Sequence, residues 1–225
     1  MPSKTIICLA NSRKSNGRCV AGIELVDDEA GSWIRPVSGS EHGEVSEADR
    51  RYEKGGDPAL LDIIDIEFTE PSPEGHQPEN WLIDDKYYWV KRGRAKLDDL
   101  DSLVGAKVPL WGIGNSTGAG LNDRVTMADA ISAGSSLVLI RAPNLQIKVF
   151  KPGEDFGNPK RRVQGRFSWA GHSYWIWVTD PIIEKRYLGH PDGEHDLNAC
   201  FLTISLGEFE GACYKLIAAV IQDTR

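Results

Sequence analysis

The sequence lacks the paired cysteines and the long apolar runs that identify several classes of protein. Its four cysteines form no CxxC pair, which disfavours both a Cys-based zinc site and a small disulfide scaffold. No apolar run approaches the ~20 residues that a transmembrane helix requires. The apolar stretch in the amino-terminal MPSKTIICLANSRK is too short for a signal peptide. The sequence therefore predicts a cytoplasmic protein that has no membrane partner.

Positive charge is also scarce, because 26 lysines and arginines face 33 aspartates and glutamates, for a net charge of −7. This balance argues against a protein that binds polyanions over its whole surface. The charge is uneven, however: residues 24–85 hold 18 acidic and 4 basic side chains, whereas residues 141–169 hold 7 basic and 2 acidic ones. The basic segment predicts a local, salt-sensitive contact with phosphates, and simple solvation of a charged surface is the alternative.

Short strand patterns fill two parts of the chain and are sparse between them. Apolar or alternating segments, typical of strands, lie at 4–10, 18–25, 33–37, 61–71, 81–91, 135–143, 145–152, 161–169, 172–180 and 199–221. Short helices are predicted at 57–61, 97–105, 127–133 and 180–187. We therefore expect a mainly β protein with β domains at 1–93 and 135–225. A glycine-rich, partly helical connector at 94–134 would join them.

Several segments resemble those of a known family. They are IICLANSRKSNGRCVAGIEL, GSWIRPVS, QPENWLI, LWGIGNSTGAGLNDRV, CFLTISLGEFEG and CYKLIAAVI, which together extend over most of the chain. In these segments the sequence resembles the bacterial dual OB-containing domain family. The resemblance implies two tandem OB-like barrels, nucleic-acid binding and a place in bacterial defence systems. It carries no catalytic residue over to this chain.

The segment KRRVQGRFSWAGHSYWIWVTD, residues 160–180, is the first candidate site. An Ala-Gly turn between two alternating runs predicts a β-hairpin. On the first strand, alternation puts Phe167 and Trp169 on one face and Arg166 on the other. On the second strand, Tyr174 lies on one face and Trp175 and Trp177 on the other, so both faces of the hairpin carry rings. Because a barrel buries only one face, rings on the other face are predicted to stack on nucleic-acid bases. The alternative is that the connector or the first domain covers that second face.

The basic loop at 11–18 is the second candidate, because loops between the first strands of an OB barrel often bind the ligand. It supplies Arg13, Lys14 and Arg18, and Arg35 follows on a later strand. An ordinary exposed turn is the alternative. The glycine-rich loop at 112–122 has neither P-loop nor GxGxxG spacing, so a tight crossing of the backbone is favoured over a phosphate cradle.

Residues 189–196, GHPDGEHD, offer histidine and carboxylate side chains in a predicted surface loop. Their spacing matches no zinc or calcium signature, so we assign no metal ligand, no cofactor and no catalytic residue. A metal-dependent hydrolase built on this loop remains an alternative function.

The sequence favours a nucleic-acid-binding module that takes single strands or ends with weak sequence preference. A scaffold whose acidic first domain contacts a protein partner is the other alternative. The predicted nucleic-acid-binding residues are Arg13, Lys14, Arg18, Arg35, Lys160, Arg161, Arg162, Arg166, Trp169, Tyr174, Trp175 and Trp177.

Overall fold

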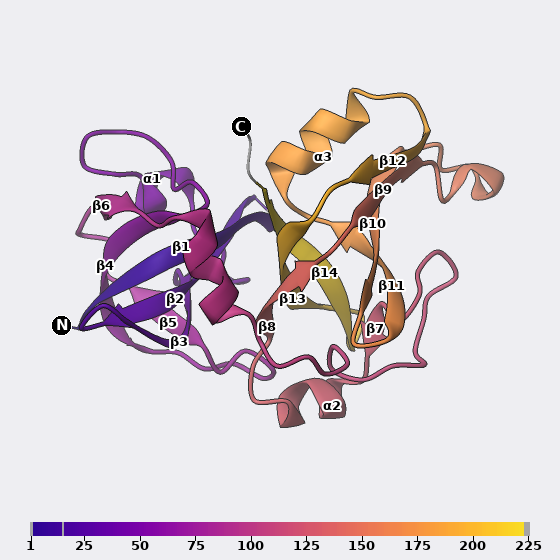
Figure 1. The fold of residues 1–225 in the computed structure, drawn as a ribbon. Coiled ribbons are helices and arrows are strands. Elements are labelled where there is room, and N and C mark those ends of the chain that lie inside the picture. The colour runs from indigo at the N-terminus through magenta and orange to yellow at the C-terminus, as the bar shows by residue number, and fades with distance from the viewer. Residues whose placement is uncertain (1, 15, 223–225) are drawn as a thin grey trace. The chain divides into compact units, whose positions relative to one another are not determined.

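The computed structural model describes residues 2–14 and 16–222, and strands dominate it (Figure 1). The chain divides into two compact units: unit 1 is Met1–Leu103 with Gly134–Ser136, and unit 2 is Val104–Ala133 with Leu137–Arg225. Residue 15 of the predicted turn at 11–18 lies outside the described residues, as do residue 1 and residues 223–225 of the predicted domains. The mainly β prediction is confirmed.

Unit 1 is a small barrel. Its elements are β1 (Ser3–Lys14), β2 (Gly17–Val26), β3 (Glu29–Val37), α1 (Glu47–Arg50), β4 (Asp62–Pro71), β5 (Asn80–Ile83), β6 (Val90–Arg94) and the 3-10 helix η1 (Leu97–Leu103). Strand β1 pairs with both β2 and β4, and β3 pairs in parallel with β5. The order β1-β2-β3-β5-β4 thus returns to β1, which makes a closed five-stranded barrel of the OB type among the described residues.

Alternating apolar side chains build the core of unit 1. On β4, Ile64, Ile66 and Phe68 are fully buried, while the residues between them face outward. Strand β1 carries a β-bulge between Cys8 and Ala10, and Gly22 on β2 permits β2 to approach β1 closely beside that bulge. A Cβ atom at Gly22 would lie 2.2 Å from the carbonyl oxygen of Ile7, so only glycine fits there.

The helical turn predicted at 57–61 is wrong, because the helix of this region is α1, which begins ten residues earlier in the chain at Glu47. Its start is fixed by a capping box: the backbone N–H of Asp49 donates to Ser46 Oγ at 3.2 Å, and the N–H of Ser46 donates to the Asp49 carboxylate at 3.1 Å. Residues 57–61 instead lead into β4 as an extended segment and a turn.

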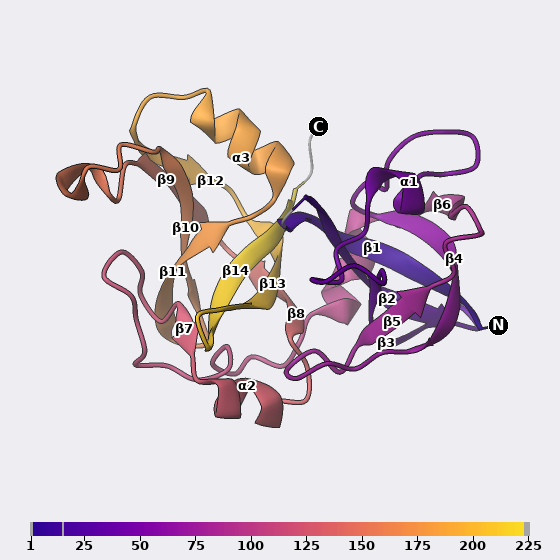
Figure 2. The ribbon, with the colours of Figure 1, turned by 180° about the vertical axis from the view of Figure 1, so that it is seen from behind.

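Unit 2 repeats the same plan with additions. Its elements are β7 (Arg124–Val125), α2 (Met127–Ser132), β8 (Leu137–Ala142), β9 (Leu145–Phe150), the 3-10 helix η2 (Glu154–Phe156), β10 (Arg162–Trp169), β11 (His172–Val178), α3 (Pro181–Leu188), β12 (Gly193–Leu197), β13 (Cys200–Phe209) and β14 (Ala212–Ile221). The sheet runs β12-β9-β10-β11-β14-β13-β8. Strands β8 and β9 are consecutive in the chain but lie in different parts of this order, β8 at one end and β9 beside β12 at the other. Figure 2 shows these strands from behind.

The two units share a topological signature. In unit 1, β3 is followed by a helix and pairs in parallel with β5; in unit 2, β11 is followed by α3 and pairs in parallel with β14. The other strand pairs of each unit are antiparallel. The expectation of two OB-like units is therefore confirmed.

The predicted hairpin is confirmed as β10 and β11. Trp169 pairs with His172 around a two-residue turn in which Ala170 and Gly171 both have positive φ, at 49° and 81°. Such a turn matches the twist of the flanking strands. The predicted short helix that follows is α3, whose N-cap Asp180 accepts hydrogen bonds from the backbone of Ile182 and Ile183. None of the helices in the described segments is long and apolar enough to span a bilayer.

Candidate functional site

The inner face of the β10–β11 hairpin belongs to the core of unit 2. Tyr174 is fully buried, and its ring stacks on Phe167 with centroids 5.4 Å apart. Its hydroxyl accepts a hydrogen bond from the backbone N–H of Leu110 at 3.1 Å. Trp169 is 6% exposed and donates from Nε1 to the carbonyl of Val108 at 2.9 Å. Because these rings are covered on the inside, Trp169 and Tyr174 present no surface on which a base can stack.

The outer face of β9, β10 and β11 carries a second set of rings, interleaved with cations. We call it the ring–cation face, and it consists of Lys148, Phe150, Arg162, Arg166, Trp175 and Trp177. The Arg166 guanidinium lies 4.2 Å from the centre of the Trp175 ring, and that of Arg162 lies 4.3 Å from the Trp177 ring. Trp175 is 38% exposed.

Strand register creates this arrangement. Arg166 lies directly opposite Trp175 on the neighbouring strand, and Arg162 lies opposite Phe150. Phe150 stacks on Trp177 with ring centroids 5.9 Å apart and planes within 19° of each other. Lys148 lies 4.8 Å from the centre of the Phe150 ring. Val149, Val163 and Ile176, at the alternate positions of the three strands, point into the core of unit 2, since strand residues alternate between faces.

Carboxylates on β12 reduce the positive charge of this face. Arg166 pairs with Glu194 at 2.9 Å, and both side chains contact solvent. The Glu194 side chain is about half exposed, whereas that of Arg166 is 17% exposed and also donates from Nε to Gln164 Oε1 at 3.2 Å, so the pair is only partly open to solvent. The pair orients the Arg166 guanidinium over Trp175 but limits the attraction that the face exerts on polyanions.

The glycine-rich segment at 112–122 covers one end of the hairpin. Leu121 exchanges two backbone hydrogen bonds with Trp175, at 3.0 and 3.2 Å. Gln164 is buried and donates from Nε2 to the carbonyl of Ala119 at 2.7 Å. Asn122 donates to the carbonyl of Ser173 at 2.9 Å. The segment therefore closes the edge of β11 and covers Gln164, while Trp175 stays exposed.

A buried lysine holds the start of the segment at 112–122 in place. Lys215 of β14 is fully buried and donates from Nζ to the carbonyl of Gly112 at 2.7 Å. Its ammonium also lies 5.2 Å from the centre of the Tyr174 ring. Burial lowers the pKa of Lys215 to about 8, although nearby Asp123 acts in the opposite direction.

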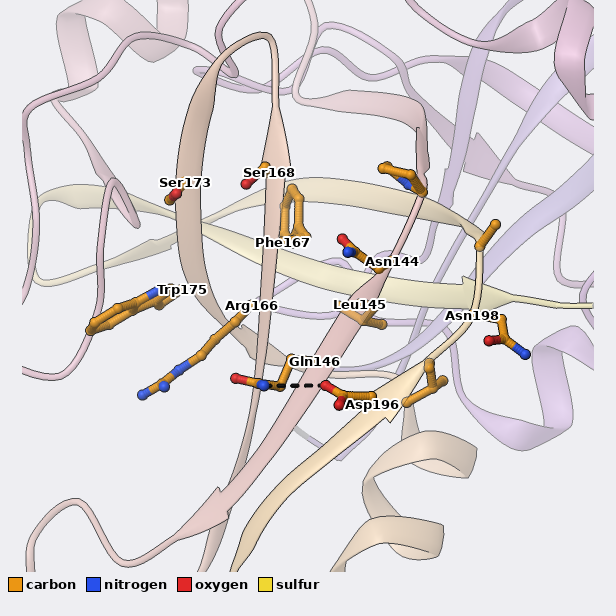
Figure 3. Close-up of a pocket in the computed structure, with 13 residues that line it drawn as sticks. Asn144, Leu145, Gln146, Arg166, Phe167, Ser168, Ser173, Trp175, Asp196 and Asn198 are labelled. Carbon is orange, nitrogen blue, oxygen red and sulfur yellow. Dashed lines mark hydrogen bonds between the residues drawn. The ribbon is translucent and has the colours of Figure 1, made fainter.

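A pocket opens beside Trp175 (Figure 3). It has a volume of about 650 Å³, which is within the range of sites for small molecules and single nucleotides. Its lining includes Asn144, Gln146, Arg166, Trp175, Asp196 and Asn198. We call it the amide pocket. Gln146 Nε2 donates to Asp196 Oδ1 at 3.2 Å, and Figure 3 shows this pair between Arg166 and Asn198.

The other basic residues predicted for the second barrel have different surroundings. Arg161 binds the Asp192 carboxylate at 2.6 Å and the carbonyl of Leu188 at 2.7 Å, so its guanidinium fastens the end of α3. Lys160 is exposed in the loop that precedes β10. Of the predicted residues in this unit, Arg162, Arg166, Trp175 and Trp177 are brought together on one face.

The basic residues predicted in the first barrel do not form one cluster. Arg13 and Arg18 are cross-strand partners at the ends of β1 and β2, and Lys14 follows on β1. Arg35 is only 2% exposed and pairs with Glu79 at 3.0 Å and with the Ser136 hydroxyl at 2.6 Å. Burial places Arg35 out of reach of a phosphate, and its charge stabilises the buried Glu79 carboxylate.

The segment 189–196 is not wholly a loop, because its second half forms β12. The rings of His190 and His195 lie 5.1 Å apart, and both pack near Tyr187. Within residues 2–14 and 16–222, no three histidine, cysteine, aspartate or glutamate side chains are grouped so as to hold a metal ion.

Burial raises the pKa of the Cys8 and Cys200 thiols to about 12.

Sequence reasoning missed part of the ring–cation face and all of the polar side of the amide pocket. Phe150 and Lys148 alternate with buried Ile147 and Val149 on β9, so the alternation was visible in the sequence. What was not visible is that β9 pairs with β10 and β12, which brings Phe150 to Trp177 and Asp196 to Gln146. The contact between Gln146 and Asp196 depends on pairing between β9 and β12, which are distant in the sequence, and the contact between Phe150 and Trp177 spans three strands.

The fold and the site together define a mainly β protein whose two units have OB-type topology and whose second unit carries partly exposed rings and cations on its β9–β11 face. The family described as Dual OB-containing domain matches residues 4–220, and the chain belongs to that family. Comparisons with curated proteins and with solved structures gave no match.

Proposed function

We propose that this protein binds single-stranded nucleic acid on the ring–cation face of unit 2. The observation that carries the proposal is the interleaving of rings and cations on one partly exposed sheet face. Trp175, Trp177 and Phe150 each have a cationic group between 4.2 and 4.8 Å from the ring centre. Rings of this kind stack on bases, and cations beside them contact the phosphates that connect the bases.

The position of the face within the barrel supports the same function. OB barrels bind oligonucleotides on the face of their second and third strands and with adjoining loops. The strands β10 and β11 occupy those positions, because they form the hairpin that precedes the helix and the parallel pair with β14. The loop between β9 and β10 adjoins this face and supplies Lys160.

The chemistry predicts binding of moderate affinity with a strong salt dependence. Stacking contributes about 1–3 kcal/mol for each base and tolerates any base, since every base has an aromatic face. Each displaced phosphate counterion adds a salt-dependent term. Glu194 and the net charge of −7 oppose the approach of a polyanion and lower the affinity, whereas release of counterions by the contacting lysine and arginine side chains makes binding weaken as salt rises.

Fluorescence anisotropy of labelled single-stranded oligonucleotides, measured at low and at moderate salt, tests the proposal. The expected result is binding at low salt that weakens in proportion to the logarithm of the salt concentration. Replacing Arg162 and Arg166 by alanine is expected to lower that slope by about 0.7 for each phosphate of the single strand that the variant no longer binds. Lys185→Ala is the matched control, because Lys185 is an exposed cation on α3 of the same unit.

Two outcomes contradict the proposal. The first is the absence of binding at low salt. The second is binding that both arginine replacements leave unchanged. A chain that binds no oligonucleotide but purifies with a basic protein would instead support a scaffold that uses the acidic surface of unit 1. Cleavage of phosphodiesters in added Mn²⁺ or Mg²⁺ would support a hydrolase. A role in bacterial defence is part of the proposal, and loss of protection against phage when the ring–cation face is altered would test it.

A further inference from the structure

The amide pocket adjoins the ring–cation face and differs from it in chemistry. Trp175 and Arg166 belong to both, so a strand that stacks on the rings passes the mouth of the pocket (Figure 3). The lining that faces solvent also includes four side chains that can recognise polar groups, namely Asn144, Gln146, Asp196 and Asn198, beside Pro143, Ala199 and two serines. A surface that only stacked bases and held phosphates would not require a carboxylate and three amides at this point.

These polar groups can recognise the edge of a base. A carboxylate only accepts hydrogen bonds, whereas an amide side chain both donates and accepts. The Asp196 carboxylate is exposed, and Gln146 occupies one of its oxygens at 3.2 Å. That hydrogen bond holds the carboxylate in place and leaves its other oxygen and further lone pairs available. Unpaired bases are recognised by stacking on aromatic or guanidinium planes combined with hydrogen bonds along the Watson–Crick edge.

This inference rests on the proposed function. We propose that the amide pocket receives one base of the bound strand, stacked on the Arg166 guanidinium, which lies between the Trp175 ring and β12, and that it prefers guanine because Asp196 accepts hydrogen bonds from the N1–H and N2–H groups of that base. The nearby amides of Asn144 and Asn198 supply donors for the guanine O6.

Other bases match the pocket less well. Guanine places two adjacent donors on its Watson–Crick edge, which is the pattern that a carboxylate accepts from. Adenine and cytosine each present one donor group on that edge beside an acceptor nitrogen. Thymine and uracil present a single N–H between two carbonyl oxygens, which a carboxylate repels. The expected order of affinity is therefore guanine, then adenine and cytosine, then thymine or uracil.

The test uses the full chain and labelled oligothymidylates that carry one central guanine, adenine, cytosine or thymine. Anisotropy titrations are expected to show at least fivefold tighter binding for guanine than for thymine, which is the low end of the discrimination that a good bidentate contact provides. Hypoxanthine in place of guanine removes the N2 amino group and should lower the affinity. By contrast, 7-deazaguanine keeps the Watson–Crick edge intact and should bind as guanine does.

The variant Asp196→Asn should abolish most of the preference, because an amide cannot accept two hydrogen bonds from adjacent donors without presenting its own donor. Its matched control is Glu194→Gln, which removes the same charge from the same strand at a residue outside the pocket lining. Glu194→Gln should change the affinity for all four oligonucleotides by one common factor. Asp196 is exposed, so Asp196→Asn is expected to leave the fold unchanged, which circular dichroism would verify.

The outcomes separate this inference from the proposed function. Equal affinity for all four oligonucleotides overturns guanine recognition and leaves the proposed function standing. No binding of any oligonucleotide overturns both. A guanine preference that Asp196→Asn retains overturns the role of the pocket. Guanosine monophosphate provides the remaining comparison: if it binds as tightly as the guanine oligonucleotide, guanine recognition is supported and the free nucleotide, not a strand, is the ligand.

Discussion

Replacing Trp175 by alanine is expected to weaken the binding of single-stranded oligonucleotides by about five- to 150-fold. The indole is 38% exposed, and the Arg166 guanidinium lies 4.2 Å from the ring centre, so the ring is held in place with part of its surface open to a base. Loss of one stacked base removes about 1–3 kcal/mol of binding free energy, and each 1.4 kcal/mol corresponds to a factor of ten in the dissociation constant.

The assay is an anisotropy titration with a labelled oligothymidylate at low salt, accompanied by a thermal melt of each protein. The melt is needed because the ring is partly buried and its removal is expected to destabilise the fold by about 1 kcal/mol. Phe209→Ala is the matched control: Phe209 is an aromatic residue of the same unit, 63% exposed, and it lies on β13 outside the ring–cation face. Binding by Trp175→Ala within twofold of the unaltered chain would refute the stacking argument.

Three further predictions concern the stability of the fold. Lys215→Met should stabilise the chain by about 2 kcal/mol at pH 7, because the buried ammonium is disfavoured while the hydrogen bond to Gly112 contributes about 1 kcal/mol. With a native pKa of about 8 and an ordinary value of 10.5, the unaltered chain binds fewer protons when folded between those pH values. The free energy of unfolding of the unaltered chain should therefore increase relative to that of Lys215→Met as the pH is raised from 8 to 10.5, and urea titrations at each pH would measure it. Gly22→Ala should destabilise unit 1 by about 1–3 kcal/mol or more, because the added methyl would meet the Ile7 carbonyl at 2.2 Å; an unchanged melting temperature would contradict this. Arg35→Met should cost about 3–5 kcal/mol by leaving Glu79 buried without its cation, and adding Glu79→Gln should recover part of that loss in the same measurement.

Local patterns were sufficient to predict the hairpin and its two faces. The Ala-Gly turn and strict alternation placed Tyr174 on the opposite face of the hairpin from Trp175 and Trp177, as the structure has them, but they did not indicate which face is buried. Alternation is a property of the strand itself and needs no knowledge of its neighbours. The capping box at Ser46–Asp49 was equally local, and weighing it would have moved the helix from 57–61 to its actual position.

Residues whose role depends on distant partners were not predictable in this way. Arginine commonly binds phosphate, which is why Arg35 was predicted to do so. In the structure, Glu79 and Ser136 enclose it in the interior of unit 1, and Ser136 is 101 residues away in the sequence. Trp169 reads like an exposed ring of a basic hairpin, yet the carbonyl of Val108 binds its indole N–H in the core. In each case the deciding contact comes from a segment that the local pattern does not include.

The amide pocket shows the same limit for function. Asp196 lies in a segment that suggested metal binding, because histidines and carboxylates alternate there. Pairing of β12 with β9 instead places Asp196 beside Gln146, and the pocket forms only once β9, β10, β11 and the start of β13 are assembled.

Photocrosslinking tests the central claim most directly. A single-stranded oligonucleotide that carries 5-iodouracil at successive positions would be irradiated in complex with the full chain, and the crosslinked peptides would be identified by mass spectrometry. The account predicts adducts on Trp175, Trp177 or Phe150, which are the rings of the ring–cation face. Crosslinks confined to unit 1, or adducts elsewhere in unit 2 with none on these three rings, would contradict it.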